Sequence, residues 1–237
     1  MGCGHGLLTP LLGRPVADRL RRHLFPRANR RRCYPSPPNA ANVRASSPLF
    51  VASDLPMSNG AAPRIEVIFS AEDIARRIGE IAGKLNAVGM QRPLVVAILK
   101  GSFVFAADLI RALHKTGMSP EVDFVTLSSY KSGTTSTGKV EILRDIEADV
   151  AGRDVIIIDD ILESGRTLAF AKDLITARGA RKVLTCVLLK KDVPRAVQIS
   201  ADYHVFDCPA GVFVIGYGMD AAHRFRELPF VGRLVEA

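Results

Sequence analysis

Regular alternation of apolar and polar positions begins only at Arg64. Residues 65–69 are typical of a short strand, and Ser70 followed by Asp73 is typical of the first turn of a helix. The apolar residues of that helix recur on one face, at Ile74, Ile78, Ile81, Leu85 and Val88. Gly89 is suited to end it, so the pattern predicts a strand followed by an amphipathic helix.

Strands and helices alternate along the rest of the chain. Further strands are predicted at 94–99, 122–127, 140–146, 155–158 and 183–189. Helices are predicted at 103–114 and 166–178, each followed within a few residues by a glycine. Wholly apolar strands such as 94–99 and 155–158 are expected to be buried on both faces. The pattern therefore predicts an α/β fold, a mostly parallel sheet flanked by helices, with ligands at the carboxyl ends of its strands.

The segment at 128–138 interrupts this alternation. It consists of serine, threonine, glycine, one tyrosine and one lysine, and it has no apolar periodicity. Because such a segment cannot pack into a core, we expect a long mobile loop between two strands.

The 237-residue chain carries a formal net charge of +8, which taken alone would indicate a polyanionic partner. Residues 1–56 contribute +7 of it, from nine arginines, no lysine and two acids. Residues 57–237 hold 23 basic residues against 22 acids, a balance of +1. The folded part is thus nearly neutral, which argues against nucleic acid as its partner.

Residues 1–56 also hold eight of the 14 prolines, so we expect a disordered extension before one compact domain at 57–237. A secretory signal is not indicated, because the arginines follow the short apolar stretch. The arginine-rich, acid-poor composition fits an organelle transit peptide, although the prolines would interrupt an amphipathic helix. We favour a third interpretation, in which Met57 is the true start of the protein.

Neither membrane association nor a disulfide framework is indicated. No apolar run approaches the roughly 18 residues needed to span a bilayer. The four cysteines, Cys3, Cys33, Cys186 and Cys208, show no CxxC spacing, which argues against a zinc site as well. We therefore expect a cytoplasmic protein in a reducing compartment.

The stretch most informative about chemistry is VIIIDDILESGRTL at 155–168. An apolar strand ends in Asp159 and Asp160, and two like charges are costly at a buried strand end unless a ligand compensates them. A vicinal diol could donate hydrogen bonds to both acids. The turn at 164–167 offers hydroxyls, backbone N–H groups and a helix N-terminus to a phosphate. Paired acids can also simply end a strand and cap a helix, but the fixed spacing favours a sugar-phosphate site.

These residues resemble the phosphoribosyl pyrophosphate (PRPP) motif of the type I phosphoribosyltransferases. Other segments are similar to the hypoxanthine-guanine phosphoribosyltransferases: LKGSF at 99–103, SY at 129–130, FVIGYGMD at 213–220 and RELP at 226–229. The resemblance covers nearly all of 65–235 and none of 1–56. It implies the type I phosphoribosyltransferase fold with a small base-binding hood, and commonly a homodimer or homotetramer.

The resemblance implies one set of residues that bind PRPP. They are Asp159, Asp160, Ser164, Gly165, Arg166, Thr167, Lys100, Gly101 and Arg226. The acid pair matches the residues that bind the ribose hydroxyls, and the turn at 164–167 matches the 5′-phosphate loop. Lys100 and Gly101 match a pyrophosphate-binding loop whose peptide is strained and often cis, and Arg226 matches an arginine that contacts pyrophosphate. Mg²⁺ is the implied cofactor, with Asp220, Asp159 and Asp160 as its candidate ligands.

A second set of residues matches the base-binding side of the family. Lys191 matches the lysine that donates to the purine 6-oxygen, and a cation there would select a 6-oxo base over adenine. Phe213 matches the aromatic residue that stacks on the base, and Val214 the backbone group at its Watson–Crick edge. Ser129 and Tyr130 match the head of a lid over the reacting centre.

One position departs from the family. Glu163 stands four residues after Asp159, where the family usually has an aspartate near purine N7. Its carboxylate, on a side chain one methylene longer, could still accept a proton from the base or bond to N7. Glu163 is therefore the candidate catalytic residue.

The activity implied by the resemblance is purine salvage. PRPP would transfer its 5-phosphoribosyl group to N9 of hypoxanthine or guanine, giving IMP or GMP and pyrophosphate. Two alternatives are a non-catalytic nucleotide- or RNA-binding regulator on the same fold, and a transferase that prefers xanthine or a pyrimidine. The nearly neutral body and the complete purine-side motif argue against the regulator.

Overall fold

The computed structural model describes residues 64–129 and 140–235 of the chain. The predictions for residues 1–56, for a start at Met57 and for most of the loop at 128–138, Tyr130 included, fall outside these ranges. No helix in the described ranges is long and apolar enough to cross a membrane.

The described chain forms a six-stranded main sheet and a separate two-stranded sheet. The main sheet has the order β4-β3-β2-β5-β6-β7, and its strands run parallel except β4, which is antiparallel to β3. Its strands are β2 (Leu94–Leu99), β3 (Glu121–Ser129), β4 (Val140–Arg144), β5 (Asp154–Leu162), β6 (Lys182–Lys191) and β7 (Tyr203–Cys208). The small sheet pairs β1 (Arg64–Phe69) with β8 (Val231–Val235), and the helices are α2 (Ala71–Ala87), α3 (Phe103–Lys115) and α4 (Arg166–Ala177).

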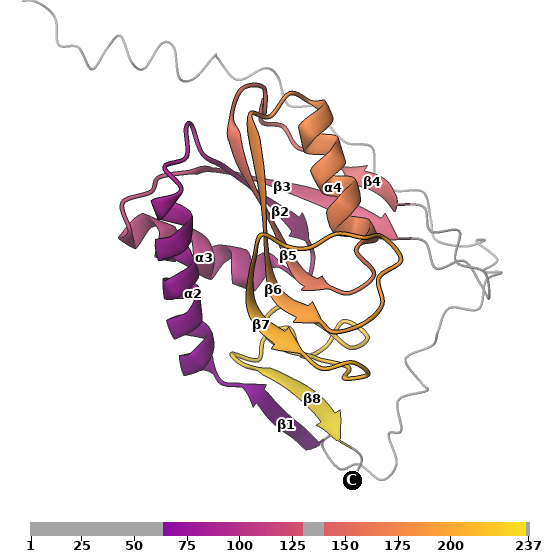
Figure 1. Cartoon of the computed structure of the whole chain (residues 1–237). Coiled ribbons are helices and arrows are strands. Elements are labelled where there is room, and N and C mark those ends of the chain that lie inside the picture. Colours follow the sequence, from indigo (N-terminus) through magenta and orange to yellow (C-terminus); the bar gives the residue numbers. More distant parts are fainter. Residues whose placement is uncertain (1–63, 130–139, 236–237) are drawn as a thin grey trace, which may run out of the picture. The chain divides into compact units, whose positions relative to one another are not determined.

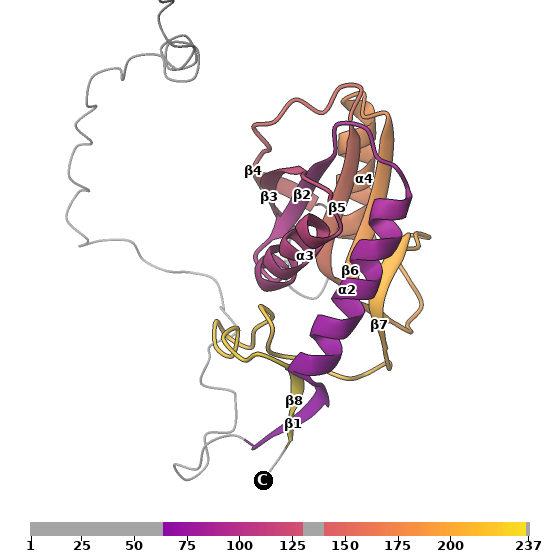
Figure 2. The ribbon, with the colours of Figure 1, turned by 90° about the vertical axis from the view of Figure 1, so that its left-hand side faces the viewer.

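Helices cover both faces of the main sheet, as the sequence predicts. The helices α2 and α3 lie on one face and α4 on the other (Figures 1 and 2). Leu85 and Leu109 pack with Ile156 on the first face, and Leu168 packs with Ile157 on the second. Successive residues of a strand point to opposite faces, so the apolar run of β5 fills both cores at once.

The small sheet lies beyond the carboxyl ends of β6 and β7 (Figure 1). Val231 of β8 is fully buried and belongs to the core under α2 and α3. Ile215 and Gly232 exchange backbone hydrogen bonds of 2.8 and 2.9 Å, which tie the segment before loop 216–226 to β8. This sheet has the place expected of a small hood beside the carboxyl ends of the main strands.

The predicted strands and helices are all present, with shifted ends, and two strands are added. The strands β7 and β8 were not predicted, because residues such as His204 and Arg233 interrupt their short apolar patterns. The strand predicted at 155–158 continues to Leu162, so Asp159 and Asp160 lie within β5 and not after its end. Pairing with β6 extends to Leu162, which explains the longer strand.

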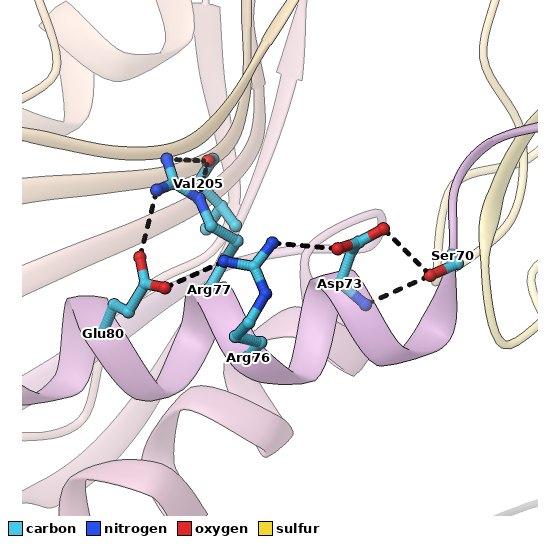
Figure 3. A network of polar contacts seen from close by, with 6 residues as sticks. All are labelled: Ser70, Asp73, Arg76, Arg77, Glu80 and Val205. Atoms are coloured by element: carbon cyan, nitrogen blue, oxygen red, sulfur yellow. Dashed lines mark hydrogen bonds and ion pairs between the residues drawn. The ribbon is translucent and has the colours of Figure 1, made fainter.

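Polar contacts fix α2 to the outer strand of the main sheet. The Ser70 hydroxyl accepts from the Asp73 backbone N–H at 3.1 Å and caps the helix. Figure 3 shows Arg77 reaching from α2 to the carbonyl of Val205 in β7, to which its Nε and a terminal nitrogen donate at 3.2 and 2.9 Å. The Arg77 guanidinium also lies 6.0 Å from the ring of Phe206. Arg77 thus satisfies a carbonyl on an edge strand, which would otherwise be open to another chain.

Replacing Arg77 by alanine should destabilise the fold. The variant loses both bonds to the Val205 carbonyl and the packing of the side chain over Phe206, so we expect the free energy of unfolding in urea to fall by about 1–2 kcal/mol. Arg76→Ala is the matched control, because Arg76 is 59% exposed and pairs only on the helix surface with Asp73 and Glu80. Equal losses in the two variants would contradict a special role for the Val205 contact.

Candidate active site

The acid pair lies where β5 stops pairing with one of its two neighbouring strands. Pairing with β2 ends at Ile158, whereas pairing with β6 continues to Leu162. Residues of β5 beyond Ile158 therefore have one open edge at the carboxyl side of the sheet. Asp159 and Asp160 occupy this part of the strand, which is where ligands bind in open α/β sheets.

The Asp159 carboxyl is buried and that of its neighbour Asp160 is partly buried. Burial raises the pKa of Asp159 well above its ordinary value, and the neighbouring charge of Asp160 raises it further. Burial also raises the pKa of Asp160, against the backbone N–H of Ile161 at 2.8 Å and the positive charge of Arg226, which both lower it. The ionised pair is thus under-compensated in the free protein, and a ligand with two donors would supply what it lacks.

The turn at 164–167 presents a helix N-terminus beside the acids. Gly165 stands before the first residue of α4 with φ +78°, a conformation that favours glycine. A side chain there would also collide with the carbonyl of Val197 and the side chain of Ile199. The glycine N-cap has no side-chain acceptor, and the Arg166 N–H makes a long bond of 3.4 Å to the Ser164 hydroxyl, so the helix N-terminus remains suited to an anion, with the exposed Ser164 and half-buried Thr167 next to it.

A cavity of about 620 Å³ brings the predicted ribose-phosphate residues together. One wall consists of the acid pair, Glu163 and the turn residues Ser164, Gly165 and Thr167. The opposite wall consists of Val193, Pro194 and Ala196, which follow β6. The Val197 N–H donates to the Ser164 carbonyl at 3.2 Å and joins the two walls.

Lys100 and Gly101 connect β2 to α3 beside this cavity. The Leu99–Lys100 peptide is cis, and the Lys100 side chain is exposed. Gly101 lies so close to Asp160 that a Cβ atom at position 101 would overlap the Asp160 carboxylate. The Lys100 carbonyl accepts from the Phe103 N–H at 3.2 Å, so these residues continue directly into α3.

Loop 216–226 also packs against Gly101. A Cβ atom at Gly218 would overlap the Gly101 carbonyl, so the loop requires glycine at this position to approach Gly101. Arg226 donates to the Gly218 carbonyl at 2.6 Å and pairs with the Asp220 carboxylate at 2.6 Å. The backbone N–H of His223 donates to Asp220 at 2.8 Å. Asp220 and Arg226 are therefore held together next to the acid pair.

Of the predicted base-side residues, Lys191 contacts Glu163 directly. Lys191 ends β6, is 7% exposed and contacts the Glu163 carboxylate at 3.1 Å, whereas the Glu163 side chain is 57% exposed. Val214 is buried, and the adjacent Phe213 is 60% exposed. The carboxylate of the longer Glu163 side chain is thus paired with Lys191, the lysine predicted to select a 6-oxo base.

The carboxylates fit a magnesium ion whose other ligands are waters and substrate phosphates. Within the described residues no three His, Cys, Asp or Glu side chains converge as a metal site would require. Asp220 and the pair Asp159 and Asp160 lie on separate segments around Gly101. Since Mg²⁺ commonly keeps several waters and binds through substrate phosphates, these few oxygen donors suit it.

Comparison with known proteins decides the family. The sequence matches the model of the phosphoribosyl transferase domain over residues 65–222. It is 42% identical over 172 residues to the hypoxanthine-guanine phosphoribosyltransferase of Streptococcus agalactiae serotype V, covering 72% of this chain and 93% of the relative. The chain belongs to the hypoxanthine-guanine phosphoribosyltransferase family.

Other members of the hypoxanthine-guanine phosphoribosyltransferase family agree. The enzyme of Dictyostelium discoideum is 39% identical over 173 residues, which cover 72% of this chain and 96% of the relative. The crystal structure of a Staphylococcus aureus hypoxanthine phosphoribosyltransferase is 38% identical, with a TM-score of 0.67 over 72% of this chain and 91% of that one. The Trypanosoma cruzi enzyme in complex with the product IMP is 36% identical, with a TM-score of 0.66 over 71% and 93% of the two chains. The predicted type I phosphoribosyltransferase fold is confirmed.

Some residues around the site were not found from the sequence. The wall formed by Val193, Pro194 and Ala196 has no chemical signature, because apolar loop residues look alike in any protein. Arg195 lies in the same segment and donates to the Lys191 carbonyl at 3.1 Å, and only its spacing of four from Lys191 could have indicated this. Contacts of these kinds depend on the tertiary fold.

The acid pair should lower the stability of the folded protein by an amount that depends on pH. In the folded protein the pKa of Asp159 lies above its ordinary value of 3.8, so between these two pKa values the folded state binds more protons than the unfolded state. Stability therefore falls as the pH rises through this window. We expect Asp159→Asn to raise the melting temperature at pH 7–8, with a gain that shrinks toward pH 4.

Asp173→Asn is the matched control for this measurement. Asp173 lies at an exposed position of α4, so its replacement should leave the pH profile of the melting temperature unchanged. Thermal melts from pH 4 to pH 8 would test both variants. A gain from Asp159→Asn that grows toward acid pH would contradict the raised pKa.

Proposed function

We propose that this chain transfers the 5-phosphoribosyl group of PRPP to N9 of hypoxanthine or guanine, giving IMP or GMP and pyrophosphate in purine salvage. The observation that carries this proposal is the single cavity lined by the acid pair, Glu163 and the phosphate-type turn at 164–167. Membership of the hypoxanthine-guanine phosphoribosyltransferase family supports the same substrates. No observation favours the RNA-binding regulator or a pyrimidine transferase.

The ribose 5-phosphate half of PRPP fits the cavity. Asp159 and Asp160 would accept the ribose 2′ and 3′ hydroxyls, which offer two donors to two buried carboxylates. Ser164, Gly165, Arg166 and Thr167 would hold the 5′-phosphate through hydroxyls and the first N–H groups of α4. Both contacts fix the sugar, so the anomeric carbon is held in place for attack.

The pyrophosphate half would lie beside Gly101. Lys100 and Gly101 would donate backbone N–H groups, and Arg226 would donate its guanidinium to the phosphate oxygens. Asp220 already orients Arg226, and together with Asp159 and Asp160 it would hold Mg²⁺. When bound, Mg²⁺ supplies positive charge to the departing pyrophosphate.

The base would lie between Lys191 and Phe213. Lys191 donates to the 6-oxygen, the exposed ring of Phe213 stacks on the purine, and the Val214 backbone meets the Watson–Crick edge. Attack of N9 on the anomeric carbon breaks the bond to pyrophosphate through a state with oxocarbenium character, and the purine must lose a proton. Glu163 would accept that proton or bond N7, and its contact with Lys191 supports a position beside the base.

A lid is the remaining part of the proposal. Ser129 ends β3 at the edge of the described residues, and Tyr130 lies beyond them. In the proposed cycle these two residues close over the reacting centre and exclude water, which would protect the oxocarbenium-like state from hydrolysis.

A panel of bases tests the proposed function. Steady-state assays with PRPP, Mg²⁺ and each of hypoxanthine, guanine, xanthine, adenine and uracil should show turnover with hypoxanthine or guanine. Adenine should be a poor substrate, because its 6-amino group is a donor and cannot accept a hydrogen bond from Lys191. Turnover confined to uracil, or to no base at all, would contradict the proposal.

The proton-accepting role of Glu163 has its own test. Glu163→Gln keeps the length of the side chain and an acceptor for Lys191 but cannot take a proton, so we expect kcat to fall about 100-fold. Glu163→Asp keeps a carboxylate and restores the usual residue of the family, so it should stay within about tenfold of wild type. If the glutamine variant keeps the kcat of the wild type, the proton-accepting role of Glu163 is contradicted.

A further inference from the structure

A buried tyrosine links loop 216–226 to helix α3, which begins just after Gly101. Tyr217 is 5% exposed and belongs to loop 216–226, which carries Asp220 and Arg226. Its hydroxyl donates to the carboxylate of Asp108, which lies on α3. Loop 216–226 is thereby bonded to the helix that follows Lys100 and Gly101.

The chemistry of this contact makes it a fixed one. Burial and the Asp108 carboxylate both raise the pKa of the Tyr217 hydroxyl far above its ordinary value, so the hydroxyl keeps its proton and remains a donor. The other oxygen of Asp108 accepts from Arg111, whose side chain is 74% exposed. The carboxylate is thus shared between one surface arginine and one buried phenol.

The backbone around Tyr217 is held in an uncommon conformation. Tyr217 has φ +51°, in the left-handed region that side chains rarely adopt, and it stands between Gly216 and Gly218, which both have positive φ. Its N–H donates to the Leu228 carbonyl at 2.9 Å, and the Gly218 N–H donates to the Arg226 carbonyl at 3.0 Å. A residue kept at such a φ indicates that its surroundings, among them the bond to Asp108, determine the course of the loop.

The α3 side of the contact is equally well fixed. The fully buried hydroxyl of Ser102 donates to the Ile98 carbonyl at 2.5 Å, and the Ala106 N–H donates to the Ser102 carbonyl at 2.8 Å. These bonds join the end of β2 to the first turn of α3. Gly101 and Asp108 therefore belong to one fixed segment, which the Tyr217 hydroxyl joins to loop 216–226.

We propose that Tyr217 and Asp108 are positioning residues for the pyrophosphate side of the site. Their hydrogen bond holds loop 216–226 against Gly101, and this sets where Asp220 and Arg226 stand relative to Asp160. Neither residue needs to touch the substrates. The inference rests on the proposed function and adds a second layer of residues to it.

The test is the removal of one hydroxyl. Tyr217→Phe keeps the buried ring and removes only the donor to Asp108. We expect the KM for PRPP to rise about tenfold, the factor that corresponds to losing one hydrogen bond to a charged acceptor, and the KM for hypoxanthine to stay within about twofold. Calorimetric titration of PRPP with Mg²⁺ into the protein should show the same loss of affinity without any base present.

Two further variants separate positioning from folding. Asp108→Asn keeps an acceptor for the Tyr217 hydroxyl and should bind PRPP nearly as well as wild type, whereas Asp108→Ala should behave like Tyr217→Phe. The double variant should be no worse than either single variant, because both remove one interaction. Tyr203→Phe, at a half-buried tyrosine on β7, is the matched control and should leave PRPP affinity unchanged.

Two outcomes overturn this inference. One is unchanged PRPP affinity in both Tyr217→Phe and Asp108→Ala, and the other is an equal rise in the KM values for PRPP and hypoxanthine. If Tyr217→Phe does not fold, Asp108→Ala and Asp108→Asn decide the question. A wild-type protein that binds PRPP but transfers it to no purine would instead contradict the proposed function, and a wild-type protein that binds no PRPP would contradict both.

Discussion

The close approach of three chain segments at Asp160, Gly101 and Gly218 is the constraint on which the rest of the site depends. A side chain at either glycine would separate the acid pair from the turn after β2, or that turn from loop 216–226. Backbone hydrogen bonds then hold these three segments in place. The charged groups come from strands and loops far apart in sequence, and without this stacking they would not share one site.

Charge is distributed around that contact in a way that suits a polyanionic substrate. The carboxylates of β5 are buried and under-compensated, while the cations Arg226 and Lys191 are each already paired with a carboxylate of their own. A site arranged like this presents hydrogen-bond acceptors to a sugar and donors to phosphates without a large excess of either sign.

The sequence was sufficient to predict the fold class, the acid pair and the phosphate-type turn of the site. The acid pair and the turn at 164–167 are contiguous in sequence, so their spacing alone indicated a sugar-phosphate site, and the structure places both on one cavity. Contacts between distant segments were not predictable. Tyr217 was noted only as part of the segment FVIGYGMD at 213–220, and nothing local to Asp108 indicated that it would accept a hydrogen bond across 109 residues of chain. Strand β7 was missed because an edge strand needs little apolar periodicity.

The raised pKa values of the acid pair also tie ligand binding to proton release. A carboxyl group that holds its proton more tightly in the empty site must give it up when a diol requires the ionised acceptor. Binding would then expel protons into the buffer, and the heat of binding would depend on the ionisation enthalpy of the buffer used. Acidification would weaken the hold on the sugar even where every contact remained in place, so the protein would respond to the acidity of its surroundings through the same two residues that we propose bind the ribose.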